Sequence, residues 1–551
     1  MQDKGGDGMS GKLVNIDNKK FNSLMELGEV KRKNGDIESS LKYFESAYDI
    51  AVLLEDKKYQ VDALIKIIDG YFYKGEIEAS IKYAEQVEGI LKNIDYVKGK
   101  LDVSLYLGNV YYMKNEYYKA REIANDALKF CAEEHIIYRG RILNLLAKLC
   151  SDLTSVDEHL DLLNQSLECF EKANYLKGIL AILNNIGVVY AEKLQDNEKA
   201  LEYFLKLKDR SEDSNYSEFI VFAYFNIGEI YSKTLRYEEA LFFCKLALEK
   251  AESSKLESMV FHSYVILISI ELKLNNYIRA HGYYNLASKE LEAYPNQGEI
   301  IPWYYKSAAS LLLEMGETKK AEISINRALE IVDNEESIIK WDTGIVYEFL
   351  KLKVSKSETD VLDALEGITY ILAKYKNSQV VLEIVYDVMV ELVDLGYSEI
   401  AFELEDKYKD IISVKKGIVL KKKYVEAIKC DNEEKQQLLT TALELAVETK
   451  HNKLQLYICS TLGEYYFKVE NYEKTITYYA IACSQIKNIV MSIPEEFRRN
   501  YINSNNILEY FNAFVSVKQY YSKENDNNRY NYLNNKEELM QFIQELDRII
   551  K

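Results

Sequence analysis

Apolar residues recur three and four positions apart along most of the chain, which is the spacing that places one apolar stripe on an α-helix. Short polar turns interrupt the stripe, and the whole pattern returns after about forty residues. The first three copies stay in register, because the pairs Leu27-Gly28, Ile67-Ile68 and Leu107-Gly108 are each forty residues apart. A fixed period of this length with helical spacing predicts an array of antiparallel helix pairs.

Small residues return at fixed places in the second half of each copy. The turn between the two helices is expected at Gly35, Gly75 and Asn115, and Ser40, Ser80 and Ala120 follow five residues later. Small side chains at such positions let paired helices approach closely. About a dozen units fit between residues 17 and 490, although the copies near 137–171, 341–375, 381–410 and 420–447 have weak signatures.

The repeated positions resemble the signature of the tetratricopeptide repeat family. The best copies are Leu107-Gly108-Tyr111-Ala120-Ala127 and Ile227-Gly228-Tyr231-Ala240-Ala247. The period exceeds the usual 34 residues of that family, and the proline that closes each unit is missing. Both differences fit a long-period variety, similar to the repeat regions of bacterial signalling ATPases and regulators. The resemblance implies a right-handed superhelical solenoid that binds partners instead of catalysing a reaction.

The composition agrees with an all-α chain of three parts. Three prolines in 551 residues leave long helices almost uninterrupted, and no alternating strand pattern stands out. We expect a flexible leader over 1–16, the solenoid over 17–490, and capping helices over 491–551 with a polar linker near 522–536. Pro494 is expected to interrupt the last helix of the repeats and to start a new helix of the cap.

The charge and the cysteines limit the partners and the compartment. Lys and Arg number 70 against 88 Asp and Glu, which gives a formal net charge of −18 and disfavours binding to nucleic acid. Seven dispersed cysteines without C-x-x-C spacing indicate a reducing compartment. We find no signal region and no apolar run long enough to insert into a membrane, so we expect a cytoplasmic protein.

The sequence offers no catalytic site. Gly6 to Lys12 match the G-x-x-x-x-G-K part of a phosphate-binding loop, but Leu13 stands where a hydroxyl is needed and no strand precedes it. The five histidines are far apart, and no metal-binding or nucleophile motif is present. We therefore predict a protein that is not an enzyme and that uses no cofactor or metal.

The candidate ligand positions lie on the first helix of each pair, which lines the concave side in the family that the chain resembles. The residue after the Leu-Gly pair gives an acidic and amide row, and aromatic and amide residues follow one turn later. The candidates are Glu29, Asp69, Asn109 and Glu229 in the row, with Phe72, Tyr73, Tyr112, Phe225 and Asn226 beside it. Carboxylates and amides there predict a basic or mixed apolar-basic segment as ligand. The competing interpretation is that the carboxylates only solvate a surface and the aromatics pack between repeats.

Two functions remain open. The first is a scaffold or adaptor in bacterial signalling or regulation that captures a segment of a protein in its groove. The alternative is a signal-peptide receptor of the quorum-sensing type that lacks its own DNA-binding domain. Chaperone tails are unlikely ligands of the first repeat, because Met25 and Glu29 stand where chaperone-binding members carry Lys and Asn.

Overall fold

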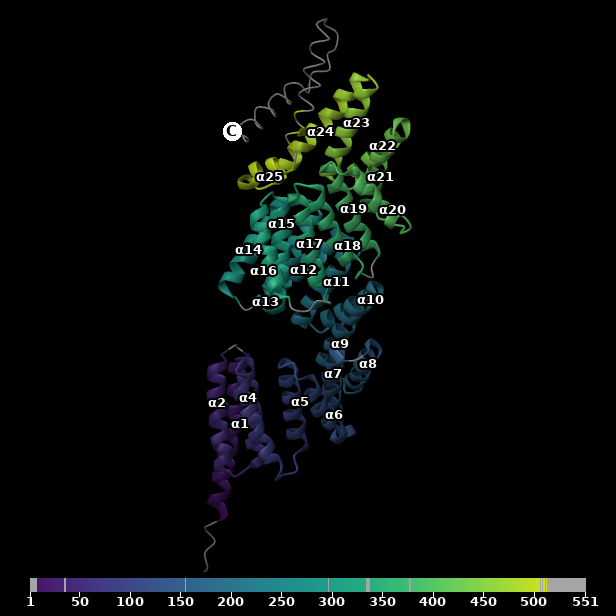
Figure 1. The fold of residues 1–551 in the computed structure, drawn as a ribbon. Helices are drawn as coiled ribbons and strands as arrows, with labels where there is room; N and C mark the ends of the chain where they lie inside the picture. The colour runs from purple at the N-terminus through teal and green to yellow at the C-terminus, as the bar shows by residue number, and fades with distance from the viewer. Residues whose placement is uncertain are drawn as a thin grey trace, which may run out of the picture. The chain divides into compact units, whose positions relative to one another are not determined.

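The computed structural model describes residues 7–33, 36–153, 155–295, 297–332, 337–375 and 378–505, together with residues 507, 509, 510 and 512. These residues form α-helices joined by short turns, and none of them lies in a strand (Figure 1). The helices α1 to α24 alternate as first and second members of helix pairs, which confirms the predicted all-α solenoid of about twelve units. The chain divides into two compact units, residues 1–194 and 195–551.

Unit 1 consists of nine α-helices and two short turns of other helix types within its described residues. Their bounds are α1 Asp7–Lys33, α2 Ile37–Leu53, α3 Lys57–Tyr73, α4 Ile77–Leu91, α5 Val97–Met113, α6 Tyr117–Phe130, the 3₁₀ turn η1 Glu133–His135, α7 Ile136–Leu153, α8 Val156–Lys172, α9 Leu176–Val188 and the π-helix η2 Val189–Leu194. The helix α1 begins inside the segment that we expected to be a flexible leader, and residues 1–6 lie outside the described residues.

Unit 2 continues the alternation. Its first part has α10 Asn197–Asp213, α11 Ser217–Lys233, α12 Tyr237–Ser253, α13 Glu257–Lys273, α14 Tyr277–Ala293, η3 Gly298–Ile300, α15 Ile301–Glu314, α16 Thr318–Ile331 and α17 Ile338–Val354. Its second part has α18 Glu358–Leu372, α19 Ser378–Asp394, α20 Ser398–Tyr408, α21 Lys416–Lys429, α22 Asn432–Glu448, α23 Asn452–Lys468, α24 Tyr472–Ser492, η4 Glu495–Phe497 and α25 Arg498–Ser504. The expected polar linker at 522–536 and the helix after it lie outside the described residues.

The turn between the two helices of a pair has one recurring backbone signature. The second residue after the first helix adopts a positive φ, as at Gly75 (77°), Asn115 (58°) and Asn275 (58°). A left-handed residue at this point turns the chain so that free carbonyl groups of the last helical turn find donors. The predicted turns at Gly75 and Asn115 are therefore confirmed, while Gly35 lies outside the described residues.

The small residues of the signature are required by packing. A Cβ atom added to Gly28 would come within 2.4 Å of the Phe44 ring, and one added to Gly228 would come within 2.4 Å of the Cys244 sulfur. The signature alanines of α6 are fully buried in the same way. Because the helices approach closely at these positions, only small residues fit there, and these small residues therefore recur in each repeat.

The π-helix η2 accommodates one additional residue in its repeat. The signature glycine and the alanine of the following helix are twelve residues apart in Gly108 and Ala120, but thirteen apart in Gly187 and Ala200. The extra residue is absorbed at the end of α9 as the wider turn Val189–Leu194. A π-helical turn is the usual form that an insertion into a helix takes. It stands at the point where the chain divides into units 1 and 2.

Candidate binding surface

The first helices of successive pairs form a common inner face in each unit. In unit 1, α3 packs on α5, α5 on α7, and α7 on α9, whereas the successive second helices of the described chain are not packed on one another to the same degree. In a curved stack the elements that approach most closely lie on the inner side. The first helices therefore line the inner face, as the family resemblance implied.

In unit 1 the acidic residues of the inner face form ion pairs with basic residues on the neighbouring first helix. Glu29 on α1 lies 2.6 Å from the Lys66 ammonium on α3, and Asp69 on α3 lies 3.3 Å from the Arg32 guanidinium on α1. Arg32 also contacts Glu29 at 2.9 Å. Burial raises the pKa of Glu29, but the bonds to Lys66 and Arg32 lower it further, so the net shift is downward. These two carboxylates are therefore occupied by cations of the chain itself.

The pairing continues toward the later helices of unit 1. The Tyr96 hydroxyl donates to Asp62 at 2.7 Å, and the Tyr138 hydroxyl donates to Asp102 at 3.0 Å. Burial and the neighbouring carboxylate together raise the pKa of both tyrosines, which stay neutral donors. The Asn185 amide donates to Asn144 at 3.1 Å, so α7 and α9 are joined by the same kind of contact. We name this series of contacts the polar ladder of unit 1.

The other predicted site residues fall into two groups. Asn109 donates to the Leu105 carbonyl of its own helix at 2.7 Å, and Glu229 pairs with Lys233 at 2.7 Å. Of the aromatic residues, Tyr73 is 63% exposed with the Arg32 guanidinium 5.8 Å from its ring centre. The remaining candidates are each partly buried on their first helices, namely Phe72, Tyr112, Phe225 and Asn226.

The structure brings five residues of unit 1 into one row and adds a member that the sequence analysis missed. The row consists of Glu29, Asp69, Asn109, Lys148 and Val188. Lys148 was overlooked because Leu146-Ala147 replaces the Leu-Gly pair in a repeat with a weak signature. Its spacing of 39 residues from Asn109 would have identified it.

Lys148 differs from every charged member of that row. It is exposed, and it makes no ion pair or hydrogen bond with any described residue. Desolvation by the surrounding protein lowers the pKa of its ammonium group. Desolvation disfavours the charged form of an ammonium group, so a neighbouring negative charge would stabilise it.

A hollow lies in the surface at the start of unit 1. Met25, Glu26, Glu29, Val30 and Lys66 line it, and Val30 is 54% exposed. The hollow is mostly apolar, with the paired Glu29 and Lys66 at its edge.

In unit 2 the corresponding side of the solenoid is filled by its own charged groups. The helix α19 carries acidic side chains one turn apart, and lysines from four other first helices reach them. The Lys273 ammonium lies 3.4 Å from Glu383 and 3.6 Å from Asp387, Lys421 lies 2.5 Å from Asp387, and Glu391 lies 3.7 Å from Lys353 and 3.8 Å from Lys453. The charges of Lys421 and Lys273 outweigh burial and lower the pKa of Asp387 to about 2. We name this set the α19 network.

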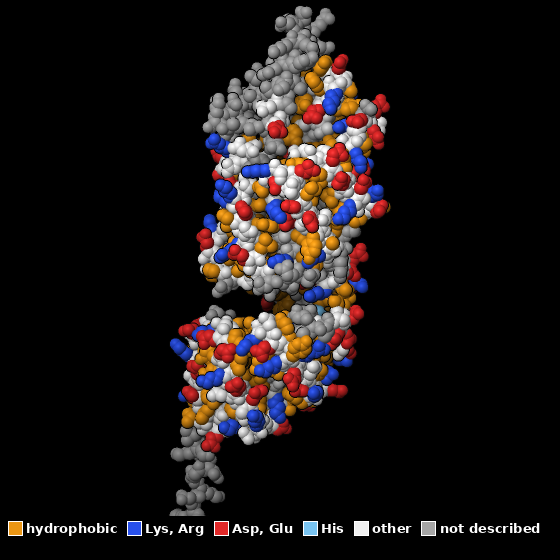
Figure 2. All heavy atoms as spheres, viewed as in Figure 1, with side chains coloured by type: hydrophobic (Ala, Val, Ile, Leu, Met, Phe, Trp, Pro, Cys, Tyr) orange, Lys and Arg blue, Asp and Glu red, His pale blue; other side chains and the backbone are white. Residues whose placement is uncertain are grey.

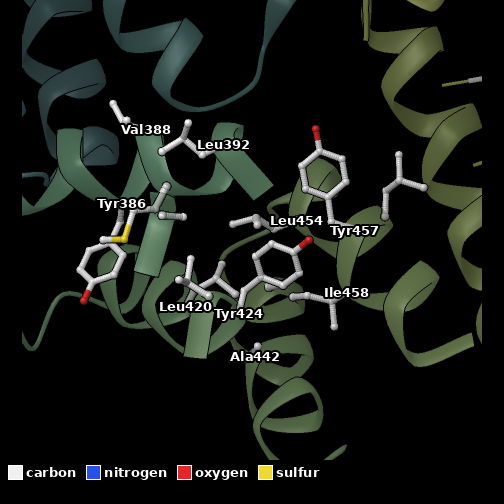
Figure 3. Close-up of a cluster of buried hydrophobic side chains, with 14 of the residues drawn as sticks. Tyr386, Val388, Leu392, Leu420, Tyr424, Ala442, Leu454, Tyr457 and Ile458 are labelled. Carbon is white, nitrogen blue, oxygen red and sulfur yellow. The ribbon is translucent and has the colours of Figure 1, made fainter. Parts of the chain in front are cut away.

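The chain after α24 also folds back onto unit 2. Figure 1 shows α25 beside α14 and α15, which lie about two hundred residues before it in the sequence. The Phe497 ring lies 5.1 Å from His281 on α14, Asn500 donates to Glu317 before α16, and the Tyr510 hydroxyl donates to Asp394 on α19 at 2.6 Å. Tyr501 is 1% exposed and belongs to the same hydrophobic core as the residues of Figure 3. We name residues Pro494–Tyr510 the return segment.

The surface chemistry gives no sign of a metal or membrane site in the described part of the chain. No group of three or more His, Cys, Asp and Glu side chains there is placed to hold a metal ion. None of the described helices combines the length and the apolar character needed to cross a membrane. Acidic and basic side chains are interspersed over the visible face of each unit, without a large region of one sign (Figure 2).

Comparison with known proteins gives one family match. Residues 178–253 match the tetratricopeptide repeat model. No curated protein matches the chain. Among solved structures, the apo form of RapI shares 19% identity over 49% of this chain and 97% of its own, with a TM-score of 0.39.

Two further structures are similar at the same level. A Rap protein complexed with competence and sporulation factor shares 14% identity over 64% of this chain and 97% of its own, with a TM-score of 0.42. A chain of the APC/C hetero-tetramer Cut9-Hcn1 shares 10% identity over 90% of this chain and 96% of its own, with a TM-score of 0.48. Scores below 0.5 support no inference about function.

Proposed function

This chain is a tetratricopeptide repeat protein, and we propose that it is a non-enzymatic scaffold or adaptor that captures a protein or peptide segment on the inner face of unit 1. Proteins of this family bind protein or peptide partners through such faces. We place the activity in bacterial signalling or regulation in the cytoplasm, in keeping with the repeat variety that the sequence resembles.

The observation that carries this proposal is the difference in how the two inner faces are covered. In unit 1, Tyr73 and Met113 project from α3 and α5 with 63% and 56% of their surface exposed. In unit 2, the α19 network joins the equivalent first helices, and Tyr510 of the return segment contacts one of them, α19. An exposed aromatic beside amide groups is the kind of surface that anchors an extended segment.

The candidates divide into anchors and polar positions. Tyr73, Phe72 and Tyr112 would supply apolar contacts, and Asn109 would exchange its bond to Leu105 for one with the ligand backbone. Phe225 and Asn226 lie on α11 in unit 2 and are not part of this proposed surface. The paired state of Glu29, Asp69 and Glu229 gives no support to a preference for basic segments, because each carboxylate already contacts a cation.

A capture experiment with matched variants tests the proposal. The full chain, the double variant Tyr73→Ala/Asn109→Ala and the control Tyr118→Ala would each be immobilised, and bound proteins and peptides would be quantified by mass spectrometry. Tyr118 is a suitable control because it is 82% exposed on the second helix α6. We expect the double variant to lose a bound partner by about tenfold or more, which is the loss of one anchor of about 1.4 kcal/mol.

Two outcomes would change the conclusion. Equal recovery of every bound molecule by the double variant and the control would contradict binding on this face. Recovery of short peptides alone, with no protein partner, would favour the alternative of a signal-peptide receptor.

A further inference from the structure

We propose that the part of the inner face formed by α7 and α9 is a site for an acidic segment, whose carboxylates are received by Lys148 and Arg141. This inference rests on the proposed function and names the chemistry of the ligand. It reverses the preference for basic segments that the acidic row suggested.

The first step is the charge that remains after the polar ladder is formed. Glu29 and Asp69 in the row of unit 1 are both paired with cations. Lys148 is the charged member of the row without a partner among the described residues. A partly desolvated ammonium without a counter-ion is costly, and a carboxylate brought by a ligand removes that cost.

The second step is the position of Arg141 on the same helix face. Arg141 stands seven residues before Lys148 on α7, which places the two side chains on one face of the helix, about two turns apart. The guanidinium is 46% exposed and lies 3.8 Å from Asp102. This contact is long for an ion pair and nearly half of the guanidinium faces solvent, so its other N–H groups can donate to a ligand carboxylate.

The third step is the spacing of the two cations. Seven residues of α-helix span about 10.5 Å. An extended segment rises about 3.3 Å per residue, so carboxylates three residues apart are separated by about 10 Å. The site therefore fits a segment in which two Asp or Glu residues are separated by two others. Asn144 and Asn185 lie between α7 and α9 and offer amide groups for the backbone of such a segment.

The charge of the whole chain makes this site selective. A formal charge of −18 repels acidic peptides from most of the surface, so their binding requires a local cationic position. Glu29 and Asp69 of the polar ladder each contact a cation of the chain, which weakens their repulsion of an acidic segment.

The experiment uses a displayed library of random dodecapeptides and the full chain as bait. Retained peptides would be synthesised with a fluorescent label, and their dissociation constants would be measured by fluorescence anisotropy at two salt concentrations. Three variants would be compared with the unchanged chain: Lys148→Glu, Arg141→Gln, and the control Lys129→Glu. Lys129 is 77% exposed on the second helix α6, so its variant makes the same charge change away from the inner face.

We expect retained peptides to carry two acidic residues three positions apart and to bind Lys148→Glu at least about tenfold more weakly. Arg141→Gln should weaken binding by a smaller factor, and Lys129→Glu should leave it unchanged. Binding should also weaken as the salt concentration rises.

The possible failures are distinguishable. Retained peptides that are basic or neutral, and whose affinity depends on Tyr73 and Asn109 but not on Lys148, would overturn the acidic site and leave the proposed function in place. Failure to retain any peptide that is sensitive to the inner face would overturn both. Circular dichroism of each variant would show that the exposed substitutions leave the helices folded.

Discussion

Units 1 and 2 use the same helix pair but join their pairs in different ways. In unit 1, each contact of the polar ladder links one first helix to the next, as Glu29 does with Lys66 and Asn144 with Asn185. In unit 2, contacts bridge partners more than a hundred residues apart, as Tyr237 does with Glu383 and Asn500 with Glu317. The cited contacts of unit 1 thus join neighbouring repeats, as expected of a solenoid, whereas those of unit 2 also join repeats that are far apart in sequence.

This difference teaches where a ligand surface can remain. A stack held together by neighbouring contacts leaves its inner face exposed between the contacts. A stack that is closed by long-range contacts uses its inner face as core, as the buried tyrosines Tyr424 and Tyr457 show (Figure 3). We therefore assign binding to unit 1 and expect unit 2 to be the more cooperative of the two.

The largest expected effect comes from breaking the α19 network. Glu391→Ala should destabilise unit 2 by about 3–5 kcal/mol, because it leaves Lys353 and Lys453 without this partner in a buried site. Their side chains are 8% and 17% exposed, and that of Glu391 is 11% exposed. Hydrogen exchange measured by mass spectrometry on the full chain should show lost protection in α17, α19 and α23.

The matched change in unit 1 is Glu29→Ala. It removes the partner of Lys66, but these side chains are 26% and 34% exposed, so the loss should be below about 1 kcal/mol. A loss as large as that of Glu391→Ala would contradict the distinction between an exposed ladder and a buried network.

A second change tests the return segment. Tyr501→Ala should cost about 3 kcal/mol, because the side chain is 1% exposed and a cavity would remain. Protection against hydrogen exchange should fall in α14 and α16, which lie far from residue 501 in sequence, and stay constant in unit 1. Arg499→Ala, at an exposed neighbouring position, should change stability by less than about 0.5 kcal/mol. If α14 and α16 kept their protection in Tyr501→Ala, the segment would not contribute to closing unit 2.

The last prediction is a dependence of the stability of unit 2 on pH. Burial lowers the pKa of His262 to about 4, and burial with the charge of Lys421 lowers that of His451 to about 4. Between the unfolded value of about 6.5 and a folded value of about 4, the unfolded chain binds more protons than the folded one. The stability of unit 2 should therefore fall as the pH is lowered from 7 toward 5.

Hydrogen exchange rates corrected for the intrinsic effect of pH would measure this dependence. The double variant His262→Gln/His451→Asn should reduce it, since Asn can still accept the bond that His451 receives from the Leu454 amide. If the stability of unit 2 depended on pH to the same extent in the double variant, the dependence would come from carboxyl groups instead of these histidines.

Much of the fold was predictable because packing repeats along the chain. The spacing of Gly108, Tyr111 and Ala120 identifies a helix pair, since these residues touch only their own pair and the next one. The same reasoning failed at Lys148, whose repeat has Ala147 in place of glycine, so a row that was expected to be acidic and amide contains a cation.

The charge of the candidate site could not be predicted for a further reason. A carboxylate such as Asp69 offers a negative charge to a ligand only if no cation of the chain is within reach. The sequence places Arg32 on a different helix 37 residues earlier, and only the packing of α1 against α3 brings the two together.

The sequence by itself determined the helix pair, its period and the small residues that let the helices meet, because these depend on contacts between near neighbours. The tertiary structure decided which inner face is open. That depends on Lys273 reaching Glu383 and on the return segment reaching α19, and each requires the curvature accumulated over several repeats. Such curvature is the sum of many small packing angles, which no single position in the sequence records.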